Sequence, residues 1–203
     1  SGDPSLMDTI KEHIKKKYGK PGKVFLGLVH RLDRPVSGVV LFARTSKAAA
    51  RLSEQWRSRS VKKVYWALVH GVMEPKEGTL TSYLLRGPKE TVLTAGEHPG
   101  AQEALLSYRT QHLGRGLSLL EVILHTGRKH QIRAQLASRG CPVVGDTRYG
   151  APPVPGEKEI RLFARSLTFT HPTRNDTLTL EAPPPEWATA FLPTGTKHTG
   201  KTP

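Results

Sequence analysis

The segment from Leu28 to Ala43, LVHRLDRPVSGVVLFA, constrains the fold more than any other part of this chain. It places one acid, Asp33, between Arg31 and Arg34, inside a run that otherwise has the apolar composition of two buried strands. If residues 28–33 are extended, successive side chains alternate between two faces, so Arg31 and Asp33 point the same way. The sequence therefore predicts a carboxylate beside guanidinium groups at the end of a strand.

The residues that follow this acid predict a bend. Pro35 cannot donate a hydrogen bond to a sheet ladder, and Ser37-Gly38 is typical of a turn. The nearly all-apolar residues 39–43 are then expected to resume as a strand. A carboxylate beside an open turn is well placed to meet a ligand, but an Arg-Asp ion pair that only stabilises the turn fits the same pattern. Under either interpretation, nearby guanidinium groups favour the ionised form of Asp33.

The charge balance favours a polyanionic partner. The chain has 203 residues, enough for one domain with a sizeable core. Its 31 Lys and Arg against 17 Asp and Glu give a formal net charge of +14 and a pI near 10.2. Such an excess predicts nucleic acid, before a membrane surface, as the partner. A merely soluble basic protein is the alternative.

The cysteine and histidine content gives further expectations. A single cysteine, Cys141, rules out an internal disulfide and predicts a reducing compartment, the cytoplasm. The nine histidines show no metal-site spacing, so we expect no metal. No apolar run is long enough for a membrane span, and no signal peptide is evident. The Ser1-Gly2 start resembles an expression scar. Whether a targeting segment precedes it is therefore left open.

Apolar periodicity predicts an α+β protein, with a single domain over residues 1–193 and a flexible polar tail at 194–203. Helices are expected over residues 3–17, 46–59, 126–138 and 187–192. Strands are expected over residues 28–33, 39–43, 61–72, 79–85, 104–110, 117–125, 161–170 and 177–180. Short turns, such as the Gly-bearing 113–116, favour antiparallel pairing. Residues 86–102 are polar and contain Gly and Pro, which predicts a mobile loop.

A second basic cluster lies at the start of the helix expected after residue 126. Arg128, Lys129 and His130 would occupy its first turn, where the helix macrodipole disfavours cations. An RNA phosphate on the free backbone N–H groups would explain this arrangement, and an exposed helix start that tolerates the cost is the alternative. Arg133 lies at the border of the buried face, so it requires a carboxylate partner, and Asp33 is the candidate.

Four segments together resemble the RluA family of RNA pseudouridine synthases. His30–Gly38, HRLDRPVSG, resembles the family signature HRLDxxTSG, which is long and specific. Lys63–Gly71 resembles the KxYxAxVxG strand, and Thr126–Arg133 resembles TGRxHQIR. Gly140–Gly150 resembles the GxPxxGDxxYG segment that follows. The segments occur in the family's order and cover residues 25–150.

The resemblance implies a mixed, largely antiparallel sheet flanked by helices, with RNA bound in a basic cleft. It implies cleavage of the bond from ribose C1′ to uracil N1, rotation of the base and joining of C1′ to C5. Asp33 would be the catalytic aspartate, Tyr65 the tyrosine that packs on the base, and Arg133 the partner of Asp33. Arg31 would help hold the extruded nucleotide, since a stacked base cannot be isomerised in place. Arg34 is also expected to bind the RNA.

The same resemblance leaves the mechanism open. An ionised Asp33 would attack C1′ or stabilise cationic character there. In a glycal route a base removes the ribose 2′ proton, and Tyr65 or Asp33 are the candidates. No redox step or hydrolysis is involved, so neither a metal nor an organic cofactor is expected.

Two departures from the family pattern concern Val36, where the signature usually has Thr, and Gln135, where the helix often has His. Neither is assigned a chemical role, so an active enzyme is expected. The family's N-terminal lysine-proline strand and an S4-like module are not found in the sequence.

Other functions have weaker support. Tyr65 fits a core tyrosine with a bonded hydroxyl. A catalytically inactive RNA-binding or chaperone protein on the same scaffold is the second hypothesis, although Asp33, Tyr65 and Arg133 are all present. A metal-dependent nuclease requires several clustered acids, and the motifs offer only Asp33 and Asp146, the latter expected to cap or turn. The RNA, ribosomal or transfer, is not specified by the sequence, and we expect a monomer.

Overall fold

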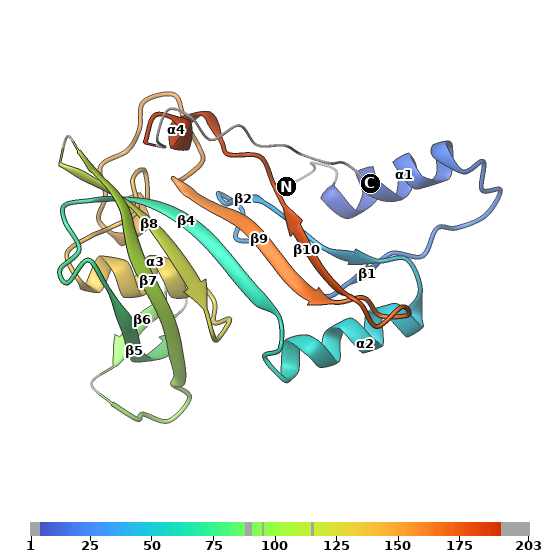
Figure 1. Cartoon of the computed structure of the whole chain (residues 1–203), viewed down its shortest axis with the longest axis horizontal. Coiled ribbons are helices and arrows are strands. Elements are labelled where there is room, and N and C mark those ends of the chain that lie inside the picture. The colour runs from blue at the N-terminus through green and yellow to red at the C-terminus, as the bar shows by residue number, and fades with distance from the viewer. Residues whose placement is uncertain (1–4, 88–90, 95, 115, 192–203) are drawn as a thin grey trace. The chain divides into compact units, whose positions relative to one another are not determined.

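The computed structural model describes residues 5–87, 91–94, 96–114 and 116–191, and divides the chain into two compact units (Figure 1). The first unit comprises Ser1–Arg31, Val40–Val61 and Phe169–Leu178. The second comprises Leu32–Val39, Lys62–Thr168 and Thr179–Pro203. The single domain expected over residues 1–193 stays a prediction, since compactness does not show whether the units fold together. The expected tail, 194–203, lies outside the described residues.

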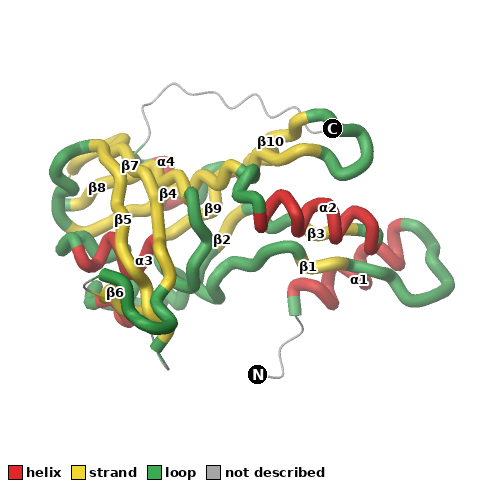
Figure 2. Tube along the Cα trace, turned by 90° about the horizontal axis from the view of Figure 1, so that it is seen from below, coloured by secondary structure: helices red, strands yellow, loops and turns green. Residues whose placement is uncertain are grey.

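The first unit joins two helices to a short antiparallel ladder. These elements are α1 (Leu6–Lys17), β1 (Gly27–Leu28), β3 (Phe42–Ala43) and α2 (Ser46–Arg57). The Ser5 hydroxyl caps α1 by accepting from the Asp8 amide, and the last turn carries lysines that complement the macrodipole. The Thr45 hydroxyl caps α2 by accepting from the Ala48 amide. Helix α2 packs along β1 and β3 (Figure 2).

The second unit is built on a sheet in the order β10-β9-β4-β8-β7-β5-β6, with β2 joining β9 in parallel. The strands are β2 (Ser37–Gly38), β4 (Lys62–His70), β5 (Glu77–Arg86), β6 (Thr91–Thr94), β7 (Gln102–Gly114), β8 (Leu117–Leu124), β9 (Leu162–Thr170) and β10 (Thr177–Glu181). The helices are α3 (Gln131–Ser138), the 3₁₀ turn η1 (Thr147–Tyr149) and α4 (Glu186–Thr189). The residues between β9 and β10 belong to the first unit. The predicted fold class, a mixed and largely antiparallel sheet flanked by helices, is confirmed.

Helix α3 packs on one face of the central strands. Ile132 and Leu136, four residues apart, are buried with Leu106, Leu120 and Val122 in the largest apolar cluster of the unit. Interiors packed in this way are nearly as dense as organic crystals, so the elements are held rigidly. The cluster therefore fixes the orientation of α3, which carries Arg133.

Four predicted elements differ from the structure in their bounds. The helix expected from residue 126 begins at Gln131, because His130 has a left-handed backbone (φ 54°) through which a helix cannot continue. The loop expected at 86–102 contains β6, which pairs with β5. Only residues 27–28 and 42–43 are strand where 28–33 and 39–43 were expected, since residues 37–38 pair with β9 instead of turning. Among the described residues, no helix is long and apolar enough to cross a membrane.

Candidate active site

Asp33 lies in the loop between β1 and β2. The Val36 amide donates to the Asp33 carbonyl at 2.9 Å, which closes a turn after the acid. The Ile160 amide then donates to the Pro35 carbonyl at 3.0 Å and ties this turn to the segment before β9. The carboxylate itself is 27% exposed. The loop therefore fixes the backbone of Asp33 and leaves its side chain reachable by a substrate.

Gly38 is required for the position of this loop. Its φ of +118° is open to glycine but strained for other residues. A Cβ at this position would lie 2.3 Å from the carbonyl oxygen of Ala164 in β9. The glycine that ends HRLDRPVSG therefore lets β2 lie directly against β9. This contact holds the loop of Asp33 in place.

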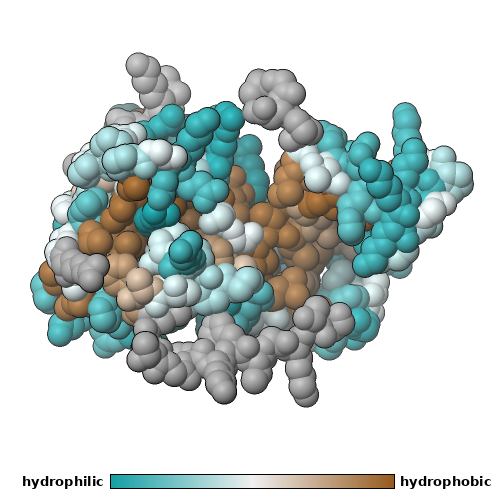
Figure 3. Space-filling model, turned by 90° about the horizontal axis from the view of Figure 1, so that it is seen from above, coloured by the Kyte–Doolittle hydropathy of each residue, from teal (hydrophilic) through white to brown (hydrophobic). Residues whose placement is uncertain are grey.

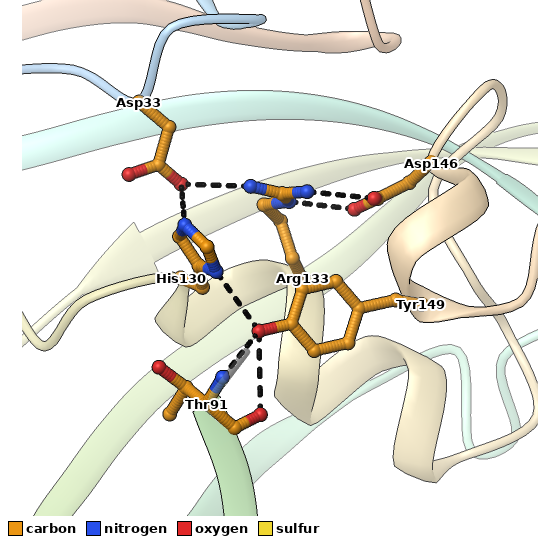
Figure 4. A network of polar contacts seen from close by, with 6 residues as sticks. All are labelled: Asp33, Thr91, His130, Arg133, Asp146 and Tyr149. Carbon is orange, nitrogen blue, oxygen red and sulfur yellow. Dashed lines mark hydrogen bonds and ion pairs between the residues drawn. The ribbon is translucent and has the colours of Figure 1, made fainter. Parts of the chain in front are cut away.

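Arg133 reaches Asp33 from helix α3 (Figure 4). Its Nη1 donates to Oδ2 of Asp33 at 3.2 Å, so the expected partner is present. Its Nε and Nη2 donate to the two carboxylate oxygens of Asp146 at 2.6 and 2.7 Å. Burial lowers the pKa of Arg133, but Asp146 and Asp33 outweigh it and raise the pKa above its usual value. Arg133 therefore stays charged although it is buried.

Asp146 is the main anchor of Arg133. It precedes the turn η1, as expected of a turn residue, but its side chain makes no capping bond and both carboxylate oxygens accept from the guanidinium instead. Its side chain is 1% exposed, and a carboxylate so deeply buried requires a charged partner. The pair with Asp146 therefore fixes the guanidinium that contacts Asp33.

His130 and Tyr149 extend this network. His130 Nε2 lies 3.8 Å from Oδ2 of Asp33, and its Nδ1 lies 3.0 Å from the Tyr149 hydroxyl. The Tyr149 hydroxyl accepts from the Thr91 amide at 2.9 Å, and its ring lies against the Arg133 guanidinium, 5.0 Å from the ring centroid. Burial lowers the pKa of His130 and outweighs the attraction of Asp33, which raises it. The imidazole is therefore neutral near pH 7.

Tyr65 lies in the central strand β4, at a bulge between β4 and β9. Burial, together with the negative charge of Asp33, raises the pKa of Tyr65 to about 12. Its hydroxyl is therefore protonated at neutral pH. The ring packs at the edge of the apolar cluster on α3 and is only partly buried, so one part of it can contact a ligand.

The other basic residues predicted from sequence have different surroundings. Arg128 and Lys129 precede α3, so the macrodipole argument for a phosphate at its first turn does not apply. The Arg128 guanidinium donates to the Glu103 carbonyl at 2.9 Å. The side chains of Arg128 and Lys129 are partly exposed. Arg34 is exposed in the loop after Asp33. Their contact with RNA stays a prediction.

Arg31 is exposed and belongs to the first unit, whereas Asp33 belongs to the second. The prediction that the two side chains point the same way stays a prediction.

Two functional candidates were missed from the sequence, and the predicted contact of His130 with an RNA phosphate stays a prediction. Asp146 and Tyr149 were quoted in GxPxxGDxxYG but given no role in the network. His130 was assigned to phosphate contact, yet it is 9% exposed and contacts Asp33 and Tyr149. The signal was available in Arg133, since a buried guanidinium has more donors than one carboxylate can satisfy. Within the described part of the chain, no group of three His, Cys, Asp or Glu side chains could hold a metal ion.

Comparison with known proteins gives a consistent result. A family model described as RNA pseudouridylate synthase matches residues 3–138. An uncharacterized RNA pseudouridine synthase of Aquifex aeolicus is 33% identical over 192 residues, which cover 90% of this chain and 60% of the relative. Ribosomal large subunit pseudouridine synthase D of Xanthomonas campestris is 36% identical over 173 residues, which cover 79% and 52%. The chain thus spans about half to three fifths of the length of these two relatives.

The fold also matches a solved structure. The human RNA pseudouridylate synthase domain containing 4 superposes with a TM-score of 0.78 at 24% identity, covering 93% of this chain and 82% of the human one. At this identity the likeness establishes the fold alone.

Proposed function

The chain belongs to the RNA pseudouridylate synthase family, and on this basis we propose that it isomerises uridines in structured RNA to pseudouridine. The reaction breaks the bond from ribose C1′ to uracil N1, turns the base and joins C1′ to C5. C5 loses its hydrogen and N1 gains one, so the composition of the nucleotide is unchanged. The observation that carries the proposal is a partly exposed carboxylate, Asp33, held by the buried Arg133–Asp146 pair.

This arrangement supports Asp33 as the catalytic group. Arg133 contacts Oδ2, while Oδ1 is turned away from the guanidinium (Figure 4). The free side of the carboxylate can approach C1′, either to form a covalent bond or to stabilise cationic character as the base leaves. Arg133 positions the acid in either case.

The pKa of about 12 favours one alternative for the glycal route. A general base works best when its pKa lies near the operating pH, so Tyr65 is a poor acceptor for the ribose 2′ proton. Asp33 is therefore the better candidate for that step. Tyr65 keeps the role of an aromatic surface for the extruded base, which replaces the stacking lost when the nucleotide leaves the RNA.

The charge of the chain supports RNA as the substrate. In the first unit, Lys11, Lys15 and Lys23 line a hollow of about 340 Å³ together with Glu12. Cations that face the backbone of RNA release its counterions, which supplies affinity without sequence preference. Arg31, Arg34, Arg128 and Lys129 are the further RNA contacts proposed from the motifs, whereas the buried His130 contacts Asp33 and Tyr149.

The finer assignments follow from these points. One relative is named as a ribosomal large subunit pseudouridine synthase, so ribosomal RNA is the first substrate to test, and transfer RNA the second. Asp33, Tyr65 and Arg133 belong to one compact unit, which supports a monomer. Cys141 is a buried free thiol, which supports a reducing compartment, the cytoplasm.

The test is release of tritium from RNA that carries uridine labelled at C5. Asp33→Asn keeps the shape of the side chain but removes its charge, so we expect release to fall by at least about 10³-fold while RNA affinity changes little. Asp176→Asn is the matched control, since this exposed acid of the first unit forms an ion pair with the likewise exposed Arg174.

Two outcomes would overturn the proposal. Normal release by Asp33→Asn would remove the catalytic assignment. RNA binding without release by the parent chain, with ribosomal and transfer RNA alike, would favour the inactive RNA-binding protein on the same scaffold.

A further inference from the structure

A chain of polar contacts leads from strand β6 to the catalytic carboxylate (Figure 4). The Thr91 amide lies 2.9 Å from the Tyr149 hydroxyl, which lies 3.0 Å from Nδ1 of His130. Nε2 of His130 lies 3.8 Å from Oδ2 of Asp33. The established motifs explain Arg133 and Asp33, but they give no role to Tyr149 or to Thr91.

The hydrogens in this chain can be assigned from chemistry. A backbone amide only donates, so the Tyr149 oxygen accepts from Thr91. The single hydroxyl hydrogen of Tyr149 then has two possible acceptors, Nδ1 of His130 at 3.0 Å and the Thr91 carbonyl at 3.2 Å. The choice between them decides which nitrogen of His130 carries the imidazole hydrogen.

The charge of Asp33 decides this choice. If Tyr149 donates to the Thr91 carbonyl, Nδ1 must carry the hydrogen, and the lone pair of Nε2 then faces a carboxylate. If Tyr149 donates to Nδ1, Nε2 carries the hydrogen and presents it to Oδ2 of Asp33. Burial disfavours the charged imidazolium, so His130 is neutral and carries one hydrogen. The second arrangement is the favourable neutral form, because it places that hydrogen toward the negative carboxylate.

We propose that Tyr149 and His130 form a donor relay from the Thr91 amide to Oδ2 of Asp33, which positions the carboxylate for reaction. The inference rests on the proposed function and deepens it. At 3.8 Å the last step is an electrostatic contact rather than a hydrogen bond, and it adds to the direct bond from Arg133 at 3.2 Å. Both donors meet Oδ2, so Oδ1 is the oxygen presented to the ribose.

The relay gives α3 an unusual start. His130 precedes the helix with φ 54°, a conformation uncommon for residues other than glycine, although histidine adopts it more readily than most. This backbone turns the imidazole toward both Tyr149 and Asp33. Backbone strain of this kind costs of order 1–3 kcal/mol and persists where the surroundings require it. The strained residue thus lies at the point where the network joins the acid.

The surroundings of His130 do not favour a phosphate contact. Its side chain is 8% exposed, and the charged groups that act on it are Asp33, Arg133, Lys129 and Arg148. The three cations lower the pKa of His130, and Asp33 raises it. His130 and Tyr149 are positioning residues in this proposal, since neither is assigned a contact with the reacting atoms.

The kinetic test uses Tyr149→Phe, which removes the hydroxyl but keeps the ring against Arg133. Loss of the relay frees Asp33 to rotate, and a misplacement of about 1 Å can cost up to about 100-fold in rate. We expect kcat for tritium release to fall at least about tenfold with KM for RNA within about threefold. Tyr108→Phe is the matched control, because it removes a hydroxyl that donates to the Pro75 carbonyl at 2.9 Å in the same unit. Its kcat should stay within about twofold of the parent.

A spectroscopic test does not depend on activity. The protein is labelled with ¹⁵N-histidine and measured by NMR. The signals of His130 are those that disappear from the spectrum of His130→Gln. The parent should show hydrogen on Nε2 at neutral pH, and Tyr149→Phe should raise the pKa of His130, because Nδ1 no longer receives a hydrogen bond.

The two tests separate the possible failures. Hydrogen on Nδ1, or an unchanged kcat in Tyr149→Phe, would overturn the relay. A loss carried by KM alone would also overturn it. If the parent releases no tritium from any RNA, the proposed function fails, and the nitrogen that carries the hydrogen still decides whether the relay exists.

Discussion

The two compact units divide charge and packing unequally. The first unit holds 63 of the 203 residues, with 13 Lys and Arg against 5 Asp and Glu, and so carries +8 of the net charge of +14. The second holds 140 residues and the remaining +6. Hydrophilic side chains cover the α1 end of the first unit (Figure 3). Its buried apolar residues include Ile14, Leu26, Leu52 and Val61.

The second unit is distinguished by its packing rather than by its charge. It contains the large apolar cluster on α3 and every residue of the network around Asp33. Attraction of a polyanion depends on net charge and needs little precision, whereas positioning a carboxylate needs rigid packing. We therefore expect the first unit to contribute most of the long-range attraction of a polyanion, and the second unit to position the carboxylate of Asp33.

The largest expected effect tests the buried ion network of the second unit. Arg133→Met leaves Asp146 buried without its partner, which should cost about 3–5 kcal/mol in the free energy of unfolding. Arg109→Met is the matched control, because Arg109 and its partner Glu121 lie in the same unit and both reach solvent, with side chains 61% and 32% exposed. Its loss should cost about 0–1 kcal/mol for the pair. Urea denaturation measures both, and equal effects would show that Asp146 does not depend on Arg133.

The second prediction asks whether the units differ in packing. Leu120→Ala removes a fully buried side chain from the cluster on α3, and Leu52→Ala removes one from α2. Each should cost about 2–5 kcal/mol, with Leu120→Ala at the upper end because Leu120 lies inside the larger buried cluster.

Hydrogen exchange shows where that loss is felt. If the units unfold separately, Leu52→Ala should lower the protection of α2 and leave β7 and β8 protected. Equal loss of protection throughout would contradict the comparison and support the single domain predicted over residues 1–193.

The third prediction tests the division of charge. Lys11→Gln with Lys15→Gln removes two charges from the hollow of the first unit, and Arg128→Gln with Lys129→Gln removes two from the second. If the first unit attracts RNA, the first pair should reduce the slope of log Kd against log salt by about 1 to 2. Filter binding across salt concentrations measures both pairs. A change only in the second pair would place the attraction beside the active site instead.

The smallest expected effect concerns Tyr65. Its folded pKa of about 12 exceeds the unfolded value near 10, so the stability it contributes is complete below pH 10 and is lost as pH rises toward 12. Between pH 8 and pH 11 the parent should lose about 1 kcal/mol relative to Tyr65→Phe. Denaturation at the two pH values measures this difference. A constant difference would mean that Tyr65 is more hydrated than its burial indicates.

Much of the fold was predictable from periodicity. The strands from residue 62 to 124 and the hairpin after residue 162 were expected within a few residues, because alternation of apolar side chains is encoded locally. Strand β6 was missed because it has only four residues within a polar segment, and pairing with β5 decides its conformation. The start of α3 was missed because the left-handed His130 depends on the contacts of its side chain.

The sequence alone determined the acid, its motif and the helix that carries Arg133, because these depend on residue types at fixed local spacing. Only the tertiary structure decided that Arg133 is shared between Asp33 and Asp146, and that Tyr149 links Thr91 to His130. Asp33 and Arg133 are 100 residues apart. Which of the possible partners a buried charge meets over such a separation depends on how the elements pack, and local sequence does not encode this.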